Sequence, residues 1–137
     1  MKKVISLLIC CVILCTISCM PISAVSDTVS PRFNNTIRVD SNFYIDSNGN
    51  ANVSVGYTGY NGITTGARIT ILLEKRTVFF SWNDVQEWVI TSSEYIGNFE
   101  RSHALTKSGV YRVTITFEIS GSGGATDVFE EQIEDSY

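Results

Sequence analysis

The amino-acid sequence predicts an all-β protein, an antiparallel β-sandwich of seven to eight strands over residues 36–137. From Thr36 onward, apolar residues alternate with polar ones at a period of two. No segment keeps the helical spacing of i, i+3, i+4 and i+7 for long. Turn residues rich in Gly and Asn separate the alternating runs. One polar face per strand indicates antiparallel sheets that are wet on one side, rather than a parallel sheet covered on both.

Residues 1–26 differ from the rest of the chain and are expected to be a secretory signal peptide. They begin with the positive stretch Met1–Lys3, continue with an almost uninterrupted apolar run over residues 4–20, and end with small residues after Pro21. We expect cleavage near Ser26–Asp27, with Ala24–Val25 as the second choice. The predicted localisation is therefore secreted, in the extracellular space.

Two alternatives for this leader remain open. A retained membrane helix would use an apolar run of about 17 residues, at the short limit of the ~20 that a bilayer needs. The segment Thr16–Cys19 loosely resembles the bacterial lipobox, so lipidation of Cys19 would anchor the protein instead of releasing it. A membrane association is expected only through an uncleaved signal or a lipidated Cys19.

The remaining residues, 27–137, contain no cysteine and carry 8 basic and 14 acidic residues, a net charge of −6. These facts exclude a disulfide scaffold, a cysteine zinc site and a cysteine nucleophile there. The acidic balance argues against a nucleic-acid partner, since phosphate binding needs a basic face. Residues 27–35 are mostly polar and are expected to be a flexible leader before the domain at 36–137.

The strands are predicted from alternation and are bounded by turn residues. The two clearest are Val110–Ser120 and Ala67–Lys75, where every second residue is apolar. Expected to face inward are Ile69, Ile71, Leu73, Tyr111, Val113, Ile115, Phe117 and Ile119. The full set of expected strands is Thr36–Ile45, Ala51–Tyr57, Ala67–Lys75, Val78–Trp82, Gln86–Thr91, Tyr95–Leu105, Val110–Ser120 and Thr126–Ile133.

The connections support hairpins. Asn48-Gly49, within Asp46–Asn50, suits a type I′ turn, which requires positive φ angles. Gly121–Gly124 joins the last two strands at hairpin length, and a Gly-containing loop follows Tyr60. Strands at this spacing are typical of a sandwich.

One local pattern makes the prediction immunoglobulin-like. Leu105 ends one strand, a turn containing Gly109 follows, and Tyr111 opens the next strand. This arrangement resembles a tyrosine corner, in which the phenol bonds back to the backbone of the preceding turn. Val113 stands where such domains often carry a cysteine, so apolar packing is expected to replace the disulfide.

The segment Val78–Ile90 contains both tryptophans, Trp82 and Trp88. We expect Val78, Phe80 and Trp82 to share one face, Phe79 to oppose them, and a hairpin turn at Asn83-Asp84. Because a sandwich has one interior, some of these rings should be exposed, where they can stack on sugars or anchor a protein. The alternative is that both indoles fill the core. The candidate contact surface, formed by this hairpin and the loop Tyr57–Gly66, comprises Tyr57, Tyr60, Phe79, Trp82 and Trp88.

Other chemistry-bearing residues have simpler interpretations. His103 is the only histidine and is expected to be a half-exposed strand residue grouped with Phe99 and Arg101. Asp46–Asn50 fails the calcium-loop pattern, because its glycine falls at position 4 instead of 6. The acidic residues 130–135 are expected to line a solvated edge strand. No catalytic residue, metal site or cofactor is predicted.

Four segments follow one another along the chain: Tyr57–Ala67, the strand carrying Glu74-Lys75, Trp88-Val89, and the stretch from Leu105 through Tyr111 to Gly124. Their order resembles a family of small secreted proteins of unknown function from Gram-positive bacteria. Each member is a signal peptide followed by one β-rich domain. The resemblance implies export and a compact sandwich, and it implies no catalytic or binding residues.

The leading functional hypothesis is a non-enzymatic extracellular binding module whose partner is a protein or a glycan. Loops on a rigid sandwich are where such scaffolds place function. A second hypothesis is a secreted membrane-active or antagonistic protein that inserts an apolar hairpin. A third is a small secreted hydrolase that would depend on His103.

Overall fold

The computed structural model describes residues 33–137, so the predicted signal peptide and residues 27–32 lie outside the described part. Residues 33–137 form seven strands joined by turns and loops, and all neighbouring strands run antiparallel. They are β1 (Thr36–Ile45), β2 (Asn50–Gly59), β3 (Thr64–Arg76), β4 (Trp82–Ser92), β5 (Ile96–Ala104), β6 (Val110–Gly121) and β7 (Asp127–Ser136).

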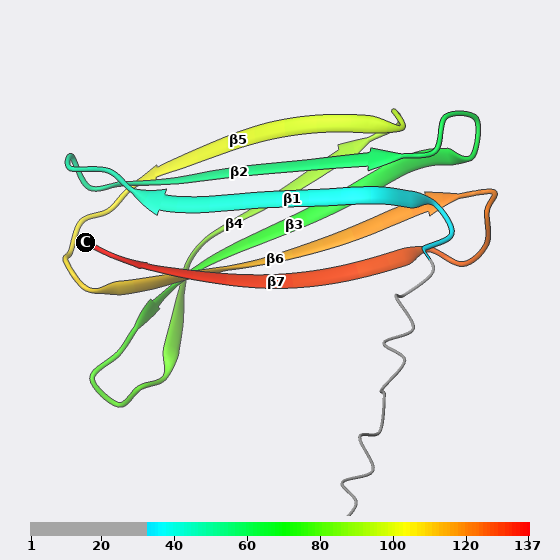
Figure 1. The fold of residues 1–137 in the computed structure, drawn as a ribbon. Coiled ribbons are helices and arrows are strands. Elements are labelled where there is room, and N and C mark those ends of the chain that lie inside the picture. Colours follow the sequence, from blue (N-terminus) through cyan, green and yellow to red (C-terminus); the bar gives the residue numbers. More distant parts are fainter. Residues whose placement is uncertain (1–32) are drawn as a thin grey trace, which may run out of the picture. The chain divides into compact units, whose positions relative to one another are not determined.

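These strands form two layers (Figure 1). One sheet has the order β1-β2-β5 and the other β4-β3-β6-β7. The prediction of an antiparallel all-β sandwich is therefore confirmed. The acidic strand β7 is an edge of the four-stranded sheet, as expected from its exposed charges.

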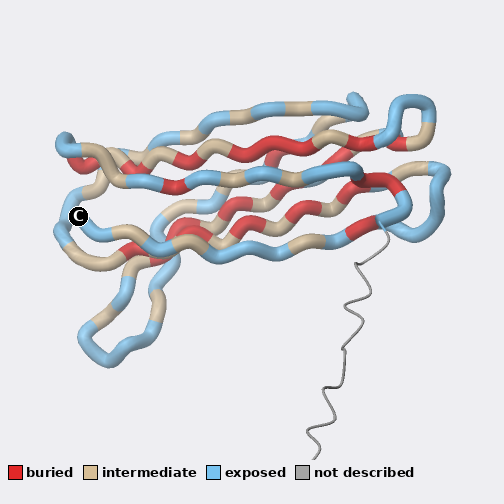
Figure 2. Tube along the Cα trace, in the orientation of Figure 1, coloured by how far each residue is buried: buried red, intermediate tan, exposed pale blue. Residues whose placement is uncertain are grey.

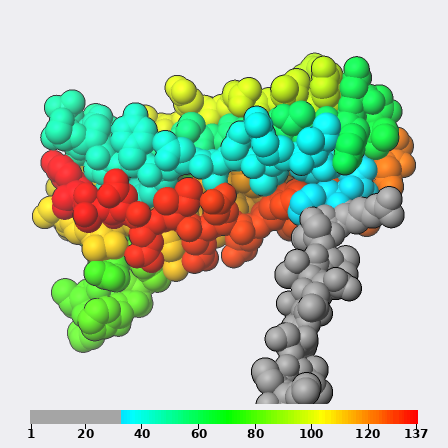
Figure 3. Space-filling model, in the orientation of Figure 1, coloured from blue at the N-terminus to red at the C-terminus, as the bar shows by residue number. Residues whose placement is uncertain are grey.

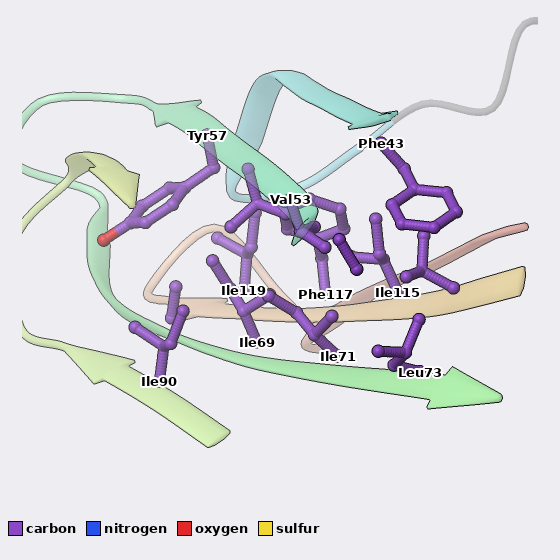
Figure 4. Close-up of a cluster of buried hydrophobic side chains, with 14 of the residues drawn as sticks. Phe43, Val53, Tyr57, Ile69, Ile71, Leu73, Ile90, Ile115, Phe117 and Ile119 are labelled. Carbon is purple, nitrogen blue, oxygen red and sulfur yellow. The ribbon is translucent and has the colours of Figure 1, made fainter. Parts of the chain in front are cut away.

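The core lies between the two sheets, and the predicted inward faces of β3 and β6 are confirmed. Ile71 and Ile115 pair across these strands and are both fully buried, and the chain shows buried and less buried positions in alternation (Figure 2). From the opposite sheet, Val53 and Tyr57 of β2 point into the same interior (Figure 4). Val113, which stands where immunoglobulin-like domains often carry a cysteine, is fully buried in this core.

The tyrosine corner is present. The Tyr111 hydroxyl donates a hydrogen bond to the backbone carbonyl of Lys107, four residues earlier. Its ring is buried, and this burial raises the pKa of the phenol. The bond fixes the turn that carries the chain from β5 in one sheet to β6 in the other.

Three local predictions are wrong. Val78–Trp82 is not a strand, because residues 77–81 form the turn between β3 and β4. The hairpin turn predicted at Asn83-Asp84 is also absent, because both residues lie in β4 and pair with Lys75 and Glu74 of β3. The turn at Asp46 is not type I′, because Gly49 alone has a positive φ there, at 78°. The Gly49 N–H instead donates to the Asp46 carbonyl, so the left-handed glycine follows the turn.

The domain begins earlier than predicted. Backbone N–H groups of Asn34 and Asn35 donate to the Asp127 carboxylate at 2.9 and 2.8 Å, and the Thr36 hydroxyl donates to it at 2.9 Å. Phe33 also contacts Phe129, with ring centroids 4.4 Å apart. The described part of the expected flexible leader is thus fastened to the start of β7.

Candidate functional site

The β3–β4 hairpin continues past the end of the sandwich and projects as a separate arm (Figures 1 and 3). Its end, the hairpin tip, consists of Val78, Phe79 and Phe80. These side chains are 86, 87 and 80% exposed, respectively. Single exposed apolar residues are ordinary on protein surfaces, but a contiguous apolar group at the end of a projection marks a contact site.

The tip is ordered by a short network at its base. The Thr77 N–H donates to the Ser81 carbonyl at 2.8 Å, and the Phe80 N–H donates to the Thr77 carbonyl at 3.1 Å. The hydroxyls of Thr77 and Ser81 are hydrogen-bonded at 2.7 Å. Phe80 has a φ of 60°, a left-handed conformation that is unfavourable for a bulky side chain. The turn therefore holds the apolar side chains outward at a conformational cost.

A β-bulge changes the orientation of the hairpin at its root. Leu73 pairs with Gln86, but Glu74 pairs with Asp84, so Val85 is the extra residue on β4. Side chains alternate between the faces of a strand, and an extra residue reverses that alternation. Trp82 and Trp88, six positions apart, consequently face opposite sides of the sheet.

Trp88 faces the interior. It pairs with Ile71, is partly buried against the core, and meets the His103 ring edge-on at a centroid distance of 6.4 Å. Trp88 therefore packs against the core while remaining half-buried, so the alternative that both indoles fill the core holds only in part and for Trp88 alone. His103 is half-buried on the same face of β5 as Phe99 and Arg101, as expected.

Trp82 lies on the outer face, where it completes a cluster with Arg112 and Glu74. Arg112 Nε and Nη2 donate to Glu74 Oε2 at 2.9 and 2.8 Å. The Arg112 guanidinium also lies over the Trp82 ring, 4.2 Å from its centroid. Glu74 is only 7% exposed, although its strand position points outward. We call these three residues the root cluster, because they stabilise the point where the arm leaves the sheet.

The stability of the root cluster requires that all three of its side chains keep their contacts. Removing water from an ion pair is costly unless both charges and their hydrogen-bonding groups are satisfied. Here Glu74 also accepts a 3.4 Å hydrogen bond from the Thr114 hydroxyl, and the indole covers the flat face of Arg112. The cluster thus connects β3, β4 and β6 at the base of the arm.

The structure does not gather the predicted contact residues into one surface. Tyr57 is wrong as a contact residue: it is 2% exposed, and its hydroxyl donates to the Glu94 carbonyl at 2.7 Å. Tyr60 is 39% exposed but follows β2, at the opposite end of β3 from Phe79. Trp82 and Trp88 are half-buried in different environments, which leaves Phe79 as the freely exposed member.

Val78 and Phe80 complete the tip, and the sequence interpretation missed their role by assigning them to a strand. The turn contains no Gly, Pro, Asn or Asp, the residues that ordinarily signal a turn. An apolar run of Val and Phe is typical of a strand, so composition pointed the wrong way. The available signal was that both faces of this segment were apolar.

Within residues 33–137, no group of three His, Cys, Asp or Glu side chains is placed to hold a metal ion. No helix in that range is long and apolar enough to cross a membrane.

No protein-family model matches the chain, and no curated protein matches it. Among solved structures, a β-glucosidase from Listeria innocua in complex with isofagomine has a similar region, with a TM-score of 0.39 and 13% sequence identity. The match covers 68% of this chain and 16% of the β-glucosidase chain. This similarity is too low to assign an activity.

Proposed function

We propose that this protein is a secreted, non-enzymatic interaction module that seats the hairpin tip in an apolar recess of a cell-surface partner. The observation that carries the proposal is the exposure of Val78, Phe79 and Phe80, each at least 80%, at the end of an ordered arm. These side chains do not stabilise the fold while they are exposed to water. Burial against a partner would be energetically favourable, which is the role we propose for them.

The energetics favour an anchor supported by other contacts. Full burial of one large apolar side chain contributes about 1.5–3 kcal/mol, so the three contribute about 4.5–9 kcal/mol. Association costs about 4–15 kcal/mol in lost freedom, less when the binding element is already ordered. The hydrogen bonds between Thr77 and Ser81 provide that order. The tip is thus expected to act as a hot spot within a wider interface.

We further infer that the scaffold is immunoglobulin-like. The hydrogen bond from Tyr111 to Lys107 and the placement of β5 and β6 in different sheets support this assignment. Export rests on the residues 1–26 pattern of a charged start and an apolar run. The resemblance to small secreted proteins of Gram-positive bacteria is consistent with both inferences.

A membrane surface is the second candidate partner. Arg76 supports it, because its guanidinium lies 6.0 Å from the Phe80 ring and places a cation beside the apolar tip. Aromatic and basic side chains together favour the lipid–water interface. The net charge of −6 over residues 27–137 opposes broad contact with anionic lipid, which ranks this candidate below a protein.

The test compares wild type with the double variant Phe79→Ser/Phe80→Asn. Asn is chosen at position 80 because it tolerates a positive φ. Tyr60→Ser, which removes an exposed aromatic at the other end of β3, is the matched control. Each protein is sedimented with intact cells of the producing species and, separately, with vesicles of phosphatidylcholine and phosphatidylglycerol.

We expect wild type and the Tyr60→Ser control to sediment with cells and the tip variant to lose at least about tenfold in affinity. Sedimentation with vesicles that is equally sensitive to the tip variant would select the membrane candidate. Equal cell binding by wild type and the tip variant, with matching melting temperatures, would refute a role for the tip.

A further inference from the structure

The outer face of the three-stranded sheet holds a polar groove of about 640 Å³. The proposed function, which depends on the hairpin tip, does not involve this groove. A smaller groove of about 240 Å³ adjoins it and shares Ser54 and Glu100 with it. Together they run along the middle strand, β2, between side chains of β1 and β5. We call this joined feature the polar trough.

The trough is built from three successive cross-strand triplets on β1, β2 and β5. Gly56, Ser54 and Asn52 of β2 form its floor and are more buried than the residues beside them. The walls on both sides are exposed side chains. The triplets are Asp40–Gly56–Asn98, Asn42–Ser54–Glu100 and Tyr44–Asn52–Ser102.

Gly56 has a steric role in the first triplet. A Cβ atom at this position would lie 2.3 Å from Asp40 Oδ2 and 2.6 Å from Asn98 Oδ1. The two wall side chains therefore lean toward each other over the glycine. They bring a carboxylate and an amide together above the floor at Gly56, where both can contact one ligand group.

The chemistry of the trough suits a polyhydroxylated ligand. Every triplet residue except Gly56 carries a side-chain oxygen, and none is aliphatic or basic. Carboxylates accept hydrogen bonds from hydroxyls, while amides and hydroxyls both donate and accept. Tyr44 is 51% exposed at one end, so its ring can stack against the face of a sugar.

The same composition disfavours other occupants. The centres of protein–protein interfaces are depleted in Asp, Glu and Ser, which line this trough. Arg38 pairs with Asp40 at 3.2 Å and Arg101 lines the smaller groove, so the carboxylates of the trough are offset only in part. A nucleic acid or an acidic polysaccharide would still meet Glu100 and would find no continuous basic face. What fits is a hydroxyl-rich chain that is uncharged or carries amines.

We propose that the polar trough binds a linear glycan of neutral or amine-bearing sugars, aligned along β2. Side chains on one face of a strand recur every two residues, about 6.6 Å, so three triplets span several sugar units. Asp40 and Asn98 bind hydroxyl or amine groups at one end, Asn42 and Glu100 contact the middle, and Tyr44 stacks at the other end. This site is independent of the hairpin tip, which belongs to the other sheet.

The experiment is isothermal titration of the protein, produced from its complete coding sequence, with cellohexaose, chitohexaose and the hexamer of glucosamine. An oligogalacturonate hexamer is the acidic comparison. The trough variants are Asp40→Ala/Asn98→Ala and, in case that pair fails to fold, Asn42→Ala/Glu100→Ala. The matched control is Asn83→Ala/Glu87→Ala, an amide and a carboxylate exposed on β4 of the other sheet.

We expect saturable binding of at least one of the first three hexamers, with a dissociation constant below about 1 mM. Each folded trough variant should weaken it by roughly tenfold or more, whereas the β4 control should not. The tip variant Phe79→Ser/Phe80→Asn should bind the hexamer normally, which separates this proposal from the proposed function. No saturable binding of any of the three, equal binding of the acidic hexamer, or full binding by the trough variants would overturn it.

Discussion

The guanidinium of Arg112 is held between Glu74, at 2.8 and 2.9 Å, and the ring of Trp82, whose centroid is 4.2 Å away. This contact exists because the bulge at Val85 turns Trp82 to the outer face of the sheet. Without that extra residue, Trp82 would share a face with Trp88 and Glu74 would lie open to water. The root cluster therefore connects a local irregularity of β4 to the position of the arm.

Trp82→Ala is expected to lower the free energy of unfolding by about 1–3 kcal/mol, because it removes the cation–π contact and exposes the ion pair to water. Urea denaturation measures the loss. In a double-mutant cycle with Glu74→Gln, the two effects should be non-additive, since both act on Arg112. Additive effects would show that the indole and the carboxylate do not share Arg112.

Phe80→Gly is expected to raise the free energy of unfolding by about 0.5–1 kcal/mol. The left-handed conformation at φ 60° costs a bulky residue about 1–2 kcal/mol, and the flexibility of glycine in the unfolded chain offsets part of the gain. Phe80→Val should be destabilising, because β-branched residues adopt positive φ poorly. Thermal unfolding of the two variants gives the comparison. A stabilising valine would contradict the turn geometry.

Tyr57→Phe is expected to cost about 0.5–1.5 kcal/mol, because the Glu94 carbonyl loses the hydrogen bond from the buried phenol. The matched change Tyr60→Phe, at a ring that is 39% exposed, should be close to neutral. Chemical denaturation of both variants separates the core tyrosine from the surface one. Equal losses in the free energy of unfolding for the two variants would indicate that the hydroxyl of Tyr57 is not in a buried hydrogen bond.

Asp127 makes the stability of the domain sensitive to acid. Burial alone raises the pKa of this carboxyl, but hydrogen bonds from the backbone of Asn34 and Asn35 and from Thr36 outweigh it and hold the pKa below the ordinary 3.8. The folded pKa is thus lower than the unfolded one. Its contribution is complete above about pH 3.8 and is lost as pH falls through the folded pKa.

Asp127→Asn is therefore expected to cost about 1–3 kcal/mol at pH 7 and progressively less below pH 3.8. Urea titrations of wild type and variant across this range measure the difference. The exposed β7 carboxylate in Glu130→Gln is the control and should show no such convergence. A constant difference at all pH values would show that the ionised carboxylate is not the stabilising group.

Strict alternation was enough to predict the architecture from sequence. The run from Tyr111 to Ile119 and the run from Ile69 to Leu73 each placed their apolar residues on one face, and these faces form the core. The tyrosine corner was also visible locally, because the spacing of Leu105, Gly109 and Tyr111 involves one short segment. Features that depend on a short stretch of sequence, such as the inward face of a strand and the tyrosine corner, could therefore be predicted.

The candidate site could not be predicted in the same way. The bulge at Val85 depends on pairing with β3, which no window of sequence displays, and it places Trp82 and Trp88 on opposite faces of the sheet. The turn at residues 77–81 uses Phe80 where a glycine would be expected, so propensity favoured a strand. The trough requires β1, β2 and β5 in register, and β5 is distant in sequence from the other two strands.

The most direct test of the proposed contact role uses a single cysteine in residues 27–137, which contain none. Phe79→Cys and, as a control, Tyr60→Cys are labelled with an environment-sensitive fluorophore, and each protein is mixed with cells of the producing species. We expect a blue shift and protection from a soluble quencher at position 79 and little change at position 60. An unchanged spectrum at position 79 while the protein is bound, or equal shifts at both positions, would contradict the proposed contact role.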